Sequence, residues 1–192
     1  MASVNELKKY LHSGRVYRRA DLARWSKSID RHLQALVRDG TVKKLSGGIY
    51  YCPEKSRFGD LPPHDADLIR AFLKDDHFYM ASLNAYNSLG VGATQLYNET
   101  LVYNDKRDGR MRLNGRPYYF IKRRFPKKGS REFLMVDLVN NLHLMAEDTE
   151  EVLKHAARNA LEMDRDKLMH AVHEYGGARA RKFYEGVFSH AS

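Results

Sequence analysis

The side chains best suited to recognising a ligand lie on one predicted helix near the N-terminus. Apolar residues recur there at helical spacing, namely Ile29, Leu33, Leu36 and Val37. This spacing predicts a helix that turns one stripe toward a core. The remaining positions then face outward, and they carry cations and polar groups: Lys27, Ser28, Arg31, Gln34 and Arg38. Arginine can pair with both acceptors of guanine, glutamine with adenine and lysine with phosphate, so we expect a helix that reads the major groove of DNA.

Basic residues also flank this helix on both sides. Arg18 and Arg19 open the preceding short helix, from which side chains commonly contact phosphate. Lys43 and Lys44 lie on a predicted β-hairpin directly after the helix, where they would follow the neighbouring DNA backbone. We interpret the four residues as phosphate contacts on either side of the groove.

Position along the helix separates the candidates further. The first residues of a recognition helix usually reach the base edges. Lys27, Ser28 and Arg31 are therefore better candidates for base contacts than Arg38. We expect Trp25 in the core, because the short second helix must pack there against the third. His32 lies at the edge of the apolar stripe, so a core and a rim position both stay open.

A second concentration of positive charge spans residues 106–131, with eleven Lys and Arg and one acid, Asp108. The predicted strand over 116–125 interleaves aromatic and basic residues, which can bind single-stranded nucleic acid. Aromatic residues on strands usually pack inward, so we expect Tyr118 and Phe120 in the core. The cations are either solvated strand ends or a secondary nucleic-acid contact, and the candidates are Arg116, Lys122, Arg123, Arg124, Lys127 and Lys128.

No arrangement of residues indicates a catalytic, cofactor or metal site. Residues 90–92 (Gly-Val-Gly) precede neither the helix nor the lysine of a phosphate-binding loop. His170 and His173 share a predicted helix, but no third ligand accompanies them. Cys52 is the single cysteine, which excludes an intrachain disulfide and a zinc site built on cysteines. We expect a protein that is not an enzyme and uses no cofactor or metal.

These side chains need a scaffold, and residues 1–52 predict one. Apolar residues recur at helical spacing over 4–11, and Ser3 with Glu6 forms a capping box at the start. Gly14 ends this first helix. A second helix, the third helix and a two-stranded hairpin follow, at about 19–25, 29–38, 41–45 and 49–51. Three helices and a hairpin within about 50 residues are typical of a winged helix-turn-helix.

The remaining chain predicts a linker and a second domain. Pro53, Pro62 and Pro63 bracket a polar stretch, which we interpret as a linker over residues 53–63. Residues 64–192 then predict a mixed domain with a small antiparallel sheet and a C-terminal helical bundle. The fold class is therefore α+β. The expected helices and strands lie at about 65–74, 78–80, 82–89, 96–103, 110–113, 116–125, 133–145, 149–162, 165–175 and 178–189.

Composition and charge agree with a nucleic-acid partner. The chain has 192 residues and a net charge of +9. Residues 1–52 carry 11 Lys and Arg against 4 Asp and Glu, residues 53–130 carry 14 against 9, and residues 131–192 carry 8 against 11. Two basic segments before an acidic one suggest that the first two meet a polyanion. No apolar run is long enough to span a membrane, and no signal peptide is apparent, so we expect a cytoplasmic protein without a membrane partner.

The order of these segments resembles the AbiEi family of antitoxins, which are transcriptional regulators of type IV toxin–antitoxin systems. The resemblance is carried by KSIDRHLQALVRDGTVKKLSGGIYY, followed by LPPHDADLIRAFL. SLNAYNSLGV and the strand-rich LVYNDKRDGRMRLNGRPYYFIKRRF come after them. It covers residues 3–125 best, and it rests on order and overall pattern.

The resemblance implies a bacterial protein with two activities. Its winged helix would bind operator repeats in double-stranded DNA and repress its own operon. Its C-terminal part would counter a partner toxin of nucleotidyltransferase type. By position, the residues that match the recognition helix are Lys27, Ser28, Arg31 and Gln34, and those that match the wing are Lys43 and Lys44. No residue is assigned to the antitoxin activity.

Two other functions remain open on the sequence alone. One is a transcription regulator whose C-terminal domain senses a ligand or dimerises, without any toxin. The other is an RNA-binding or nucleic-acid-processing protein that uses residues 106–131. The oligomeric state is a monomer or a homodimer, because two monomers on inverted repeats can occupy a palindromic operator as a dimer does.

Overall fold

A computed structural model describes residues 4–190 of the chain, and its fold class is α+β. The capping box predicted at Ser3 lies outside the described residues. Contacts between residues divide the chain into two units. Unit 1 comprises residues 1–76 together with 112–116, and unit 2 comprises residues 77–111 together with 117–192.

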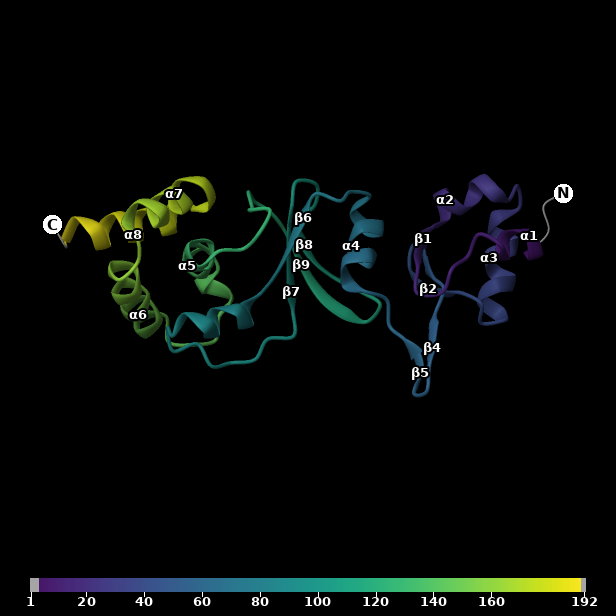
Figure 1. The fold of residues 1–192 in the computed structure, drawn as a ribbon, viewed down its shortest axis with the longest axis horizontal. Helices are drawn as coiled ribbons and strands as arrows, with labels where there is room; N and C mark the ends of the chain where they lie inside the picture. Colours follow the sequence, from purple (N-terminus) through teal and green to yellow (C-terminus); the bar gives the residue numbers. More distant parts are fainter. Residues whose placement is uncertain (1–3, 191–192) are drawn as a thin grey trace. The chain divides into compact units, whose positions relative to one another are not determined.

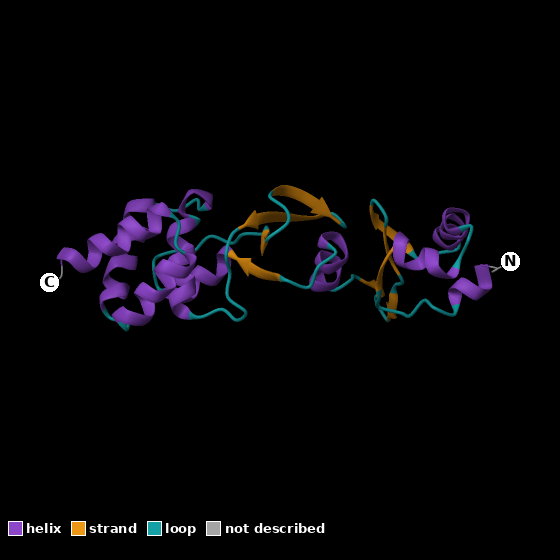
Figure 2. Ribbon diagram, turned by 90° about the horizontal axis from the view of Figure 1, so that it is seen from above, coloured by secondary structure: helices purple, strands orange, loops and turns teal. Residues whose placement is uncertain are grey.

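Unit 1 begins with short helices and a three-stranded antiparallel sheet (Figures 1 and 2). Its helical segments are α1 (Val4–Lys8), α2 (Arg19–Leu22), the 3-10 helix η1 (Ala23–Trp25) and α3 (Ile29–Arg38). The strands follow the order β1–β3–β2, and they are β1 (Val16–Arg18), β2 (Lys43–Ser46) and β3 (Ile49–Tyr51). The core between helices and sheet contains Leu7, Leu22, Ile29, Leu33, Leu36, Val42 and Tyr50.

Strand β1 is an element that the sequence pattern did not predict. It pairs with β3, so that Val16 lies opposite Tyr51. Backbone bonds continue the pairing, because Gly14 N donates to Cys52 O at 2.8 Å and Cys52 N donates to Arg15 O at 3.0 Å. A three-residue strand is too short to show alternation, and its pairing with β3 is what keeps it extended.

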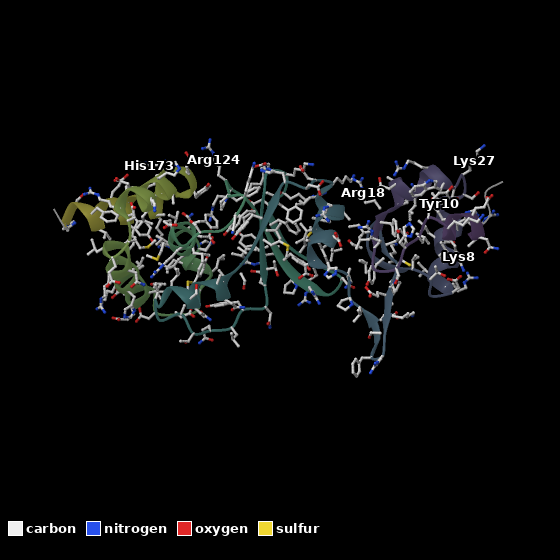
Figure 3. The ribbon with its side chains drawn as sticks, in the orientation of Figure 1. Lys8, Tyr10, Arg18, Lys27, Arg124 and His173 are labelled. Carbon is white, nitrogen blue, oxygen red and sulfur yellow. The ribbon has the colours of Figure 1, made fainter. Side chains whose placement is uncertain are left out.

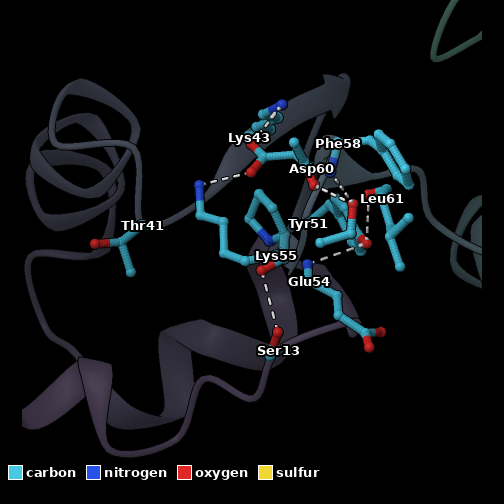
Figure 4. Close-up of polar contacts among 12 residues, drawn as sticks. Ser13, Thr41, Lys43, Tyr51, Glu54, Lys55, Phe58, Asp60 and Leu61 are labelled. Atoms are coloured by element: carbon cyan, nitrogen blue, oxygen red, sulfur yellow. Dashed lines mark hydrogen bonds and ion pairs between the residues drawn. The ribbon is translucent and has the colours of Figure 1, made fainter.

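The stretch predicted as a linker, residues 53–63, contains an antiparallel hairpin of β4 (Glu54–Ser56) and β5 (Gly59–Leu61). Figure 4 shows how it is held. Tyr51 Oη donates to Leu61 O at 2.8 Å, and Ser13 Oγ donates to Pro53 O at 3.1 Å. Helix α4 (Asp65–Leu73) follows within unit 1. The first division between the units therefore falls after Asp76 and not within the predicted linker.

Unit 2 contains a four-stranded sheet of order β6–β7–β9–β8. Its strands are β6 (Phe78–Ser82), β7 (Thr100–Asn104), β8 (Gly109–Leu113) and β9 (Arg116–Lys122). The sheet is mixed rather than antiparallel as predicted, because β7 and β9 pair in parallel, with Leu101 opposite Tyr119. The reason is that β8 lies at the sheet edge, so the chain returns through β9 beside β7 in the same direction. Residues 112–116, which comprise the end of β8, the turn and the first residue of β9, group with unit 1.

Helices make up the rest of unit 2 (Figure 2). They are the 3-10 helices η2 (Leu83–Leu89) and η3 (Leu142–Leu144), and the α-helices α5 (Arg131–Asn140), α6 (Thr149–Leu161), α7 (Arg165–Tyr175) and α8 (Ala178–His190). Side chains of Ser130, Asp148 and Asp164 cap α5, α6 and α7 by accepting bonds from free backbone N–H groups. Helix α5 is the most buried, with Met135, Val136, Leu138 and Val139 fully enclosed. Within residues 4–190, no helix is long and apolar enough to cross a membrane.

Candidate nucleic-acid interface

Helix α3 forms because its apolar residues match the helical repeat and pack on α1 and the sheet. Leu33 and Leu36 are buried with at most 1% of their surface exposed, and Ile29 is buried as well. Val37, which we expected in the same stripe, is 40% exposed. The buried stripe is therefore narrower than predicted, and Val37 lies at its margin.

The outward face of α3 carries the predicted recognition residues, and all of them are exposed: Lys27, Ser28, Arg31, Gln34 and Arg38. Ser28 occupies the N-cap position, but its side chain makes no capping bond. Within residues 4–190, no acid pairs with Lys27, Arg31 or Arg38. Three charged side chains and one amide therefore remain available for an external partner.

His32 belongs to the core, which decides between the two positions left open by the sequence. Its exposed fraction is 5%, and its Nδ1 lies 2.8 Å from Ser26 Oγ. Ser26 is buried as well, with 4% of its surface exposed. The pair satisfies two buried polar groups beneath the start of the helix.

Arg18 and Arg19, predicted as phosphate contacts, are each paired with an acid of unit 1. Arg18 donates two bonds to Asp21, at 2.7 and 2.9 Å. Arg19 donates two bonds to Asp30, both at 2.6 Å, and these bonds lower the pKa of the Asp30 carboxyl. A phosphate would therefore have to replace or share a carboxylate at both positions.

The two lysines of β2 differ in whether an acid pairs with them. Lys43 Nζ lies 2.8 Å from Asp60 Oδ2, and Lys55 pairs with the other oxygen of that carboxylate at 2.6 Å (Figure 4). These bonds lower the pKa of Asp60. Lys44 is exposed, and no acid of the described chain pairs with it. Lys44 is consequently the freer of the two cations, while Lys43 holds the β4–β5 hairpin.

We predicted Trp25 in the core, but its side chain is only partly buried. Its ring packs partly on the core of unit 1 and stacks on Tyr10, with ring centroids 4.7 Å apart and planes at 7°. Tyr10 itself is 44% exposed. Trp25 lies at the end of the 3-10 helix η1, and its ring is only partly buried, so the aromatic pair reaches the surface of unit 1.

The second basic segment is dispersed by the fold. Arg116 Nη1 binds Asp65 Oδ1 at 2.7 Å, and Arg124 lies toward α7, with Nη1 3.8 Å from Glu174 Oε2 (Figure 3). Tyr118 and Phe120 are buried, as we predicted. Among the six predicted contact residues, three are exposed and pair with no acid of the described chain: Lys122, Lys127 and Lys128.

Arg123 differs from its neighbours because it faces the interior of unit 2. Its Nη1 donates to Asn141 Oδ1 at 3.1 Å and lies 3.9 Å from Asp137 Oδ1. Its guanidinium also lies 5.8 Å from the centroid of the Tyr103 ring. Arg123 was predicted as a surface contact for nucleic acid, but its guanidinium is engaged with a buried polar cluster.

That cluster is the main polar feature that sequence reasoning missed. Asp137 is 1% exposed and accepts bonds from Tyr86 Oη at 2.7 Å and Tyr103 Oη at 2.6 Å. Asn141 Nδ2 donates to both tyrosine oxygens, at 2.9 and 2.6 Å. Burial raises the pKa of Asp137, while the tyrosine bonds and the charge of Arg123 oppose that rise. An acid in the middle of an apolar helix, FLMVDLV, was the available signal.

The side chains of this cluster are closed to solvent, so the cluster is part of the internal structure of unit 2.

His77 and Asp105, whose Nδ1 and Oδ2 are 2.8 Å apart, form an exposed pair on unit 2. Within residues 4–190, no three His, Cys, Asp or Glu side chains gather closely enough to hold a metal ion. Comparisons of the chain with protein-family models, with curated proteins and with solved structures found no match.

Proposed function

We propose that unit 1 is a winged helix-turn-helix that binds double-stranded DNA, with α3 in the major groove. The observation that carries the proposal is the outer face of α3. Lys27, Arg31, Gln34 and Arg38 are all exposed along it, and no acid of the described chain neutralises its cations. Asp30, the acid within this helix, is bonded to Arg19 and not to these cations.

The element order supports the same proposal. Arg19 N donates to Gly48 O at 2.8 Å, which holds the tip of the β2–β3 hairpin beside the start of α2. The Arg19–Asp30 bonds connect that point to the first turn of α3. Hairpin tip, α2 start and α3 start thus share one surface, as a wing and a recognition helix do when they contact one DNA segment.

The direct test uses duplex fragments from the DNA upstream of this protein's own reading frame. We expect specific binding to one fragment, and we expect Arg31→Ala to weaken it by about 1–3 kcal/mol. Lys44→Ala should weaken specific and non-specific duplexes alike and flatten the salt dependence. Arg57→Ala is the matched control, because Arg57 is an exposed cation at the tip of the β4–β5 hairpin.

Two outcomes would contradict the proposal. Binding that Arg31→Ala leaves unchanged at low and moderate salt would mean that α3 does not read the groove. Equal losses for Arg31→Ala and Arg57→Ala would mean that the protein only senses total charge.

The antitoxin activity is a second proposal, and it rests on the resemblance to the AbiEi family. We propose that the protein represses its own operon and counters a toxin of nucleotidyltransferase type. Where a gene for such a toxin lies beside its own, co-expression of the two should restore the growth that the toxin alone arrests. Growth that stays arrested, with DNA binding intact, would favour a regulator without a toxin. Metal-dependent cleavage of labelled RNA or DNA would instead favour a nucleic-acid-processing enzyme.

A further inference from the structure

A groove of about 620 Å³ runs between α1 and η1 on unit 1. Lys9 and Tyr10 contribute to one wall, and Arg24, Trp25 and Lys27 to the other. The groove lies next to the start of α3, because Lys27 is two residues before Ile29, where that helix begins. None of its residues except Lys27 belongs to the recognition face described above.

The aromatic part of the groove is a stacked pair on the surface. The Tyr10 and Trp25 rings are 4.7 Å apart and nearly parallel, and the Arg24 guanidinium carbon lies 5.0 Å from the Trp25 ring centroid. Arg24 Nε also donates to Asp21 O at 3.2 Å, which fixes the guanidinium near the ring. The apolar wall is thus rigid and bordered by a positive charge.

The polar part of the groove is predominantly basic. Lys9, Arg24 and Lys27 are exposed, and Glu6 is the one acid among the lining residues. No carboxylate of the described chain pairs with the three cations. A groove with an aromatic wall and cations that no carboxylate neutralises fits a chain that alternates apolar and anionic groups.

We propose that this groove holds the sugar–phosphate backbone of a DNA strand that flanks the segment read by α3. Deoxyribose packs against the Tyr10–Trp25 pair, and phosphates bind Lys9 and Arg24. The inference rests on the proposed DNA-binding function and extends its footprint to α1 and η1. Continuity through Lys27 favours DNA over an acidic peptide, since Lys27 lines the groove and also begins the outward face of α3.

The chain supplies its own reporter, because Trp25 is its single tryptophan. The experiment titrates the full-length protein with a random-sequence duplex labelled with fluorescein, and it records anisotropy and Trp25 emission together. Occupation of the groove should change the intensity and wavelength of that emission. The double variant Lys9→Ala/Arg24→Ala is compared with Arg57→Ala, which also removes an exposed cation of unit 1 and lies outside the groove.

Salt dependence measures the number of phosphates that are lost. Each lost phosphate contact should lower the slope of log K against log salt by about 0.9, so two contacts lower it by about 1.8. Between 50 and 200 mM salt, the affinity gap between wild type and the double variant should therefore shrink about twelvefold. Arg57→Ala should keep the wild-type slope, and thermal unfolding should show that both variants fold.

Each outcome decides a different point. A changed Trp25 emission with a reduced slope in the double variant alone supports the groove. Duplex binding with an unchanged emission and a wild-type slope overturns the groove and leaves the proposed function standing. The absence of duplex binding in wild type overturns the proposed function and the groove with it. A Trp25 response to polyglutamate but not to the duplex overturns the inference in favour of an acidic protein partner.

Discussion

Tyr103→Phe tests whether the buried cluster of unit 2 stabilises the fold. The Tyr103 hydroxyl is fully enclosed, donates to Asp137 Oδ1 at 2.6 Å and accepts from Asn141 Nδ2 at 2.6 Å. Phenylalanine keeps the ring and removes both bonds, so a buried carboxylate and a buried amide each lose a partner. A bond to a charged group contributes about 1.5–3 kcal/mol, and we expect the free energy of unfolding to fall by that amount.

Urea denaturation of the full-length chain, followed by far-UV circular dichroism, measures the loss. Tyr119→Phe is the matched control, because Tyr119 is half-buried on β9, the strand beside β7, and its hydroxyl has no hydrogen-bond partner among residues 4–190. Its substitution should change stability by less than about 0.5 kcal/mol. If Tyr103→Phe costs no more than Tyr119→Phe, the cluster does not stabilise unit 2 and our reasoning is wrong.

Three further predictions concern charge and packing. Burial raises the pKa of Asp137 above its ordinary value of 3.8, so between 3.8 and this raised pKa the folded protein binds more protons than the unfolded chain. The wild type should therefore lose stability relative to Asp137→Asn as pH rises through this range. A difference in unfolding free energy between the two proteins that stays constant with pH in urea titrations would contradict this. Asp30→Ala frees Arg19, so the slope of log K against log salt for a duplex should steepen by about 0.9, and an unchanged slope in anisotropy titrations would show that Arg19 does not reach phosphate. Leu33→Ala, at a site 1% exposed, should lower the free energy of unfolding by about 2–5 kcal/mol in thermal or urea denaturation, and a loss below 1 kcal/mol would contradict its place in the core.

The sequence predicted the elements with strong periodicity and missed those that depend on pairing. The stripe of Ile29, Leu33 and Leu36 was sufficient to predict α3, because each side chain repeats at helical spacing within one segment. Strand β1 carries no such repeat, and only its pairing with β3 makes it extended. The polar residues of the β4–β5 hairpin are typical of a linker. The pairing of Asp60 with Lys43 of β2 and Lys55 of β4, which holds the hairpin in place, is not visible in the sequence.

Side-chain partners were harder to predict than elements. The spacing of Arg19 and Asp30 along the chain says nothing about their contact, which depends on how α2 lies against α3. The outward direction of Arg31 needed only the helical repeat, and it matches the exposure in the structure. Asp137 and Tyr86 come together across 51 residues, a distance over which local patterns carry no information.

Residues 112–116 belong to unit 1 although they lie far along the chain from residues 1–76, and this affects how unit 1 could be produced as a fragment. Leu113 is 1% exposed, and Arg116 pairs with Asp65 in the same unit. A fragment that stops at Asp76 loses both residues, so we expect it to fold less stably than unit 1 does in the full chain. An exchange of N-terminal modules between genes would likewise have to carry a short internal segment along. Unit 1 is therefore built from two separate stretches of the chain, and an N-terminal fragment contains only the first of them.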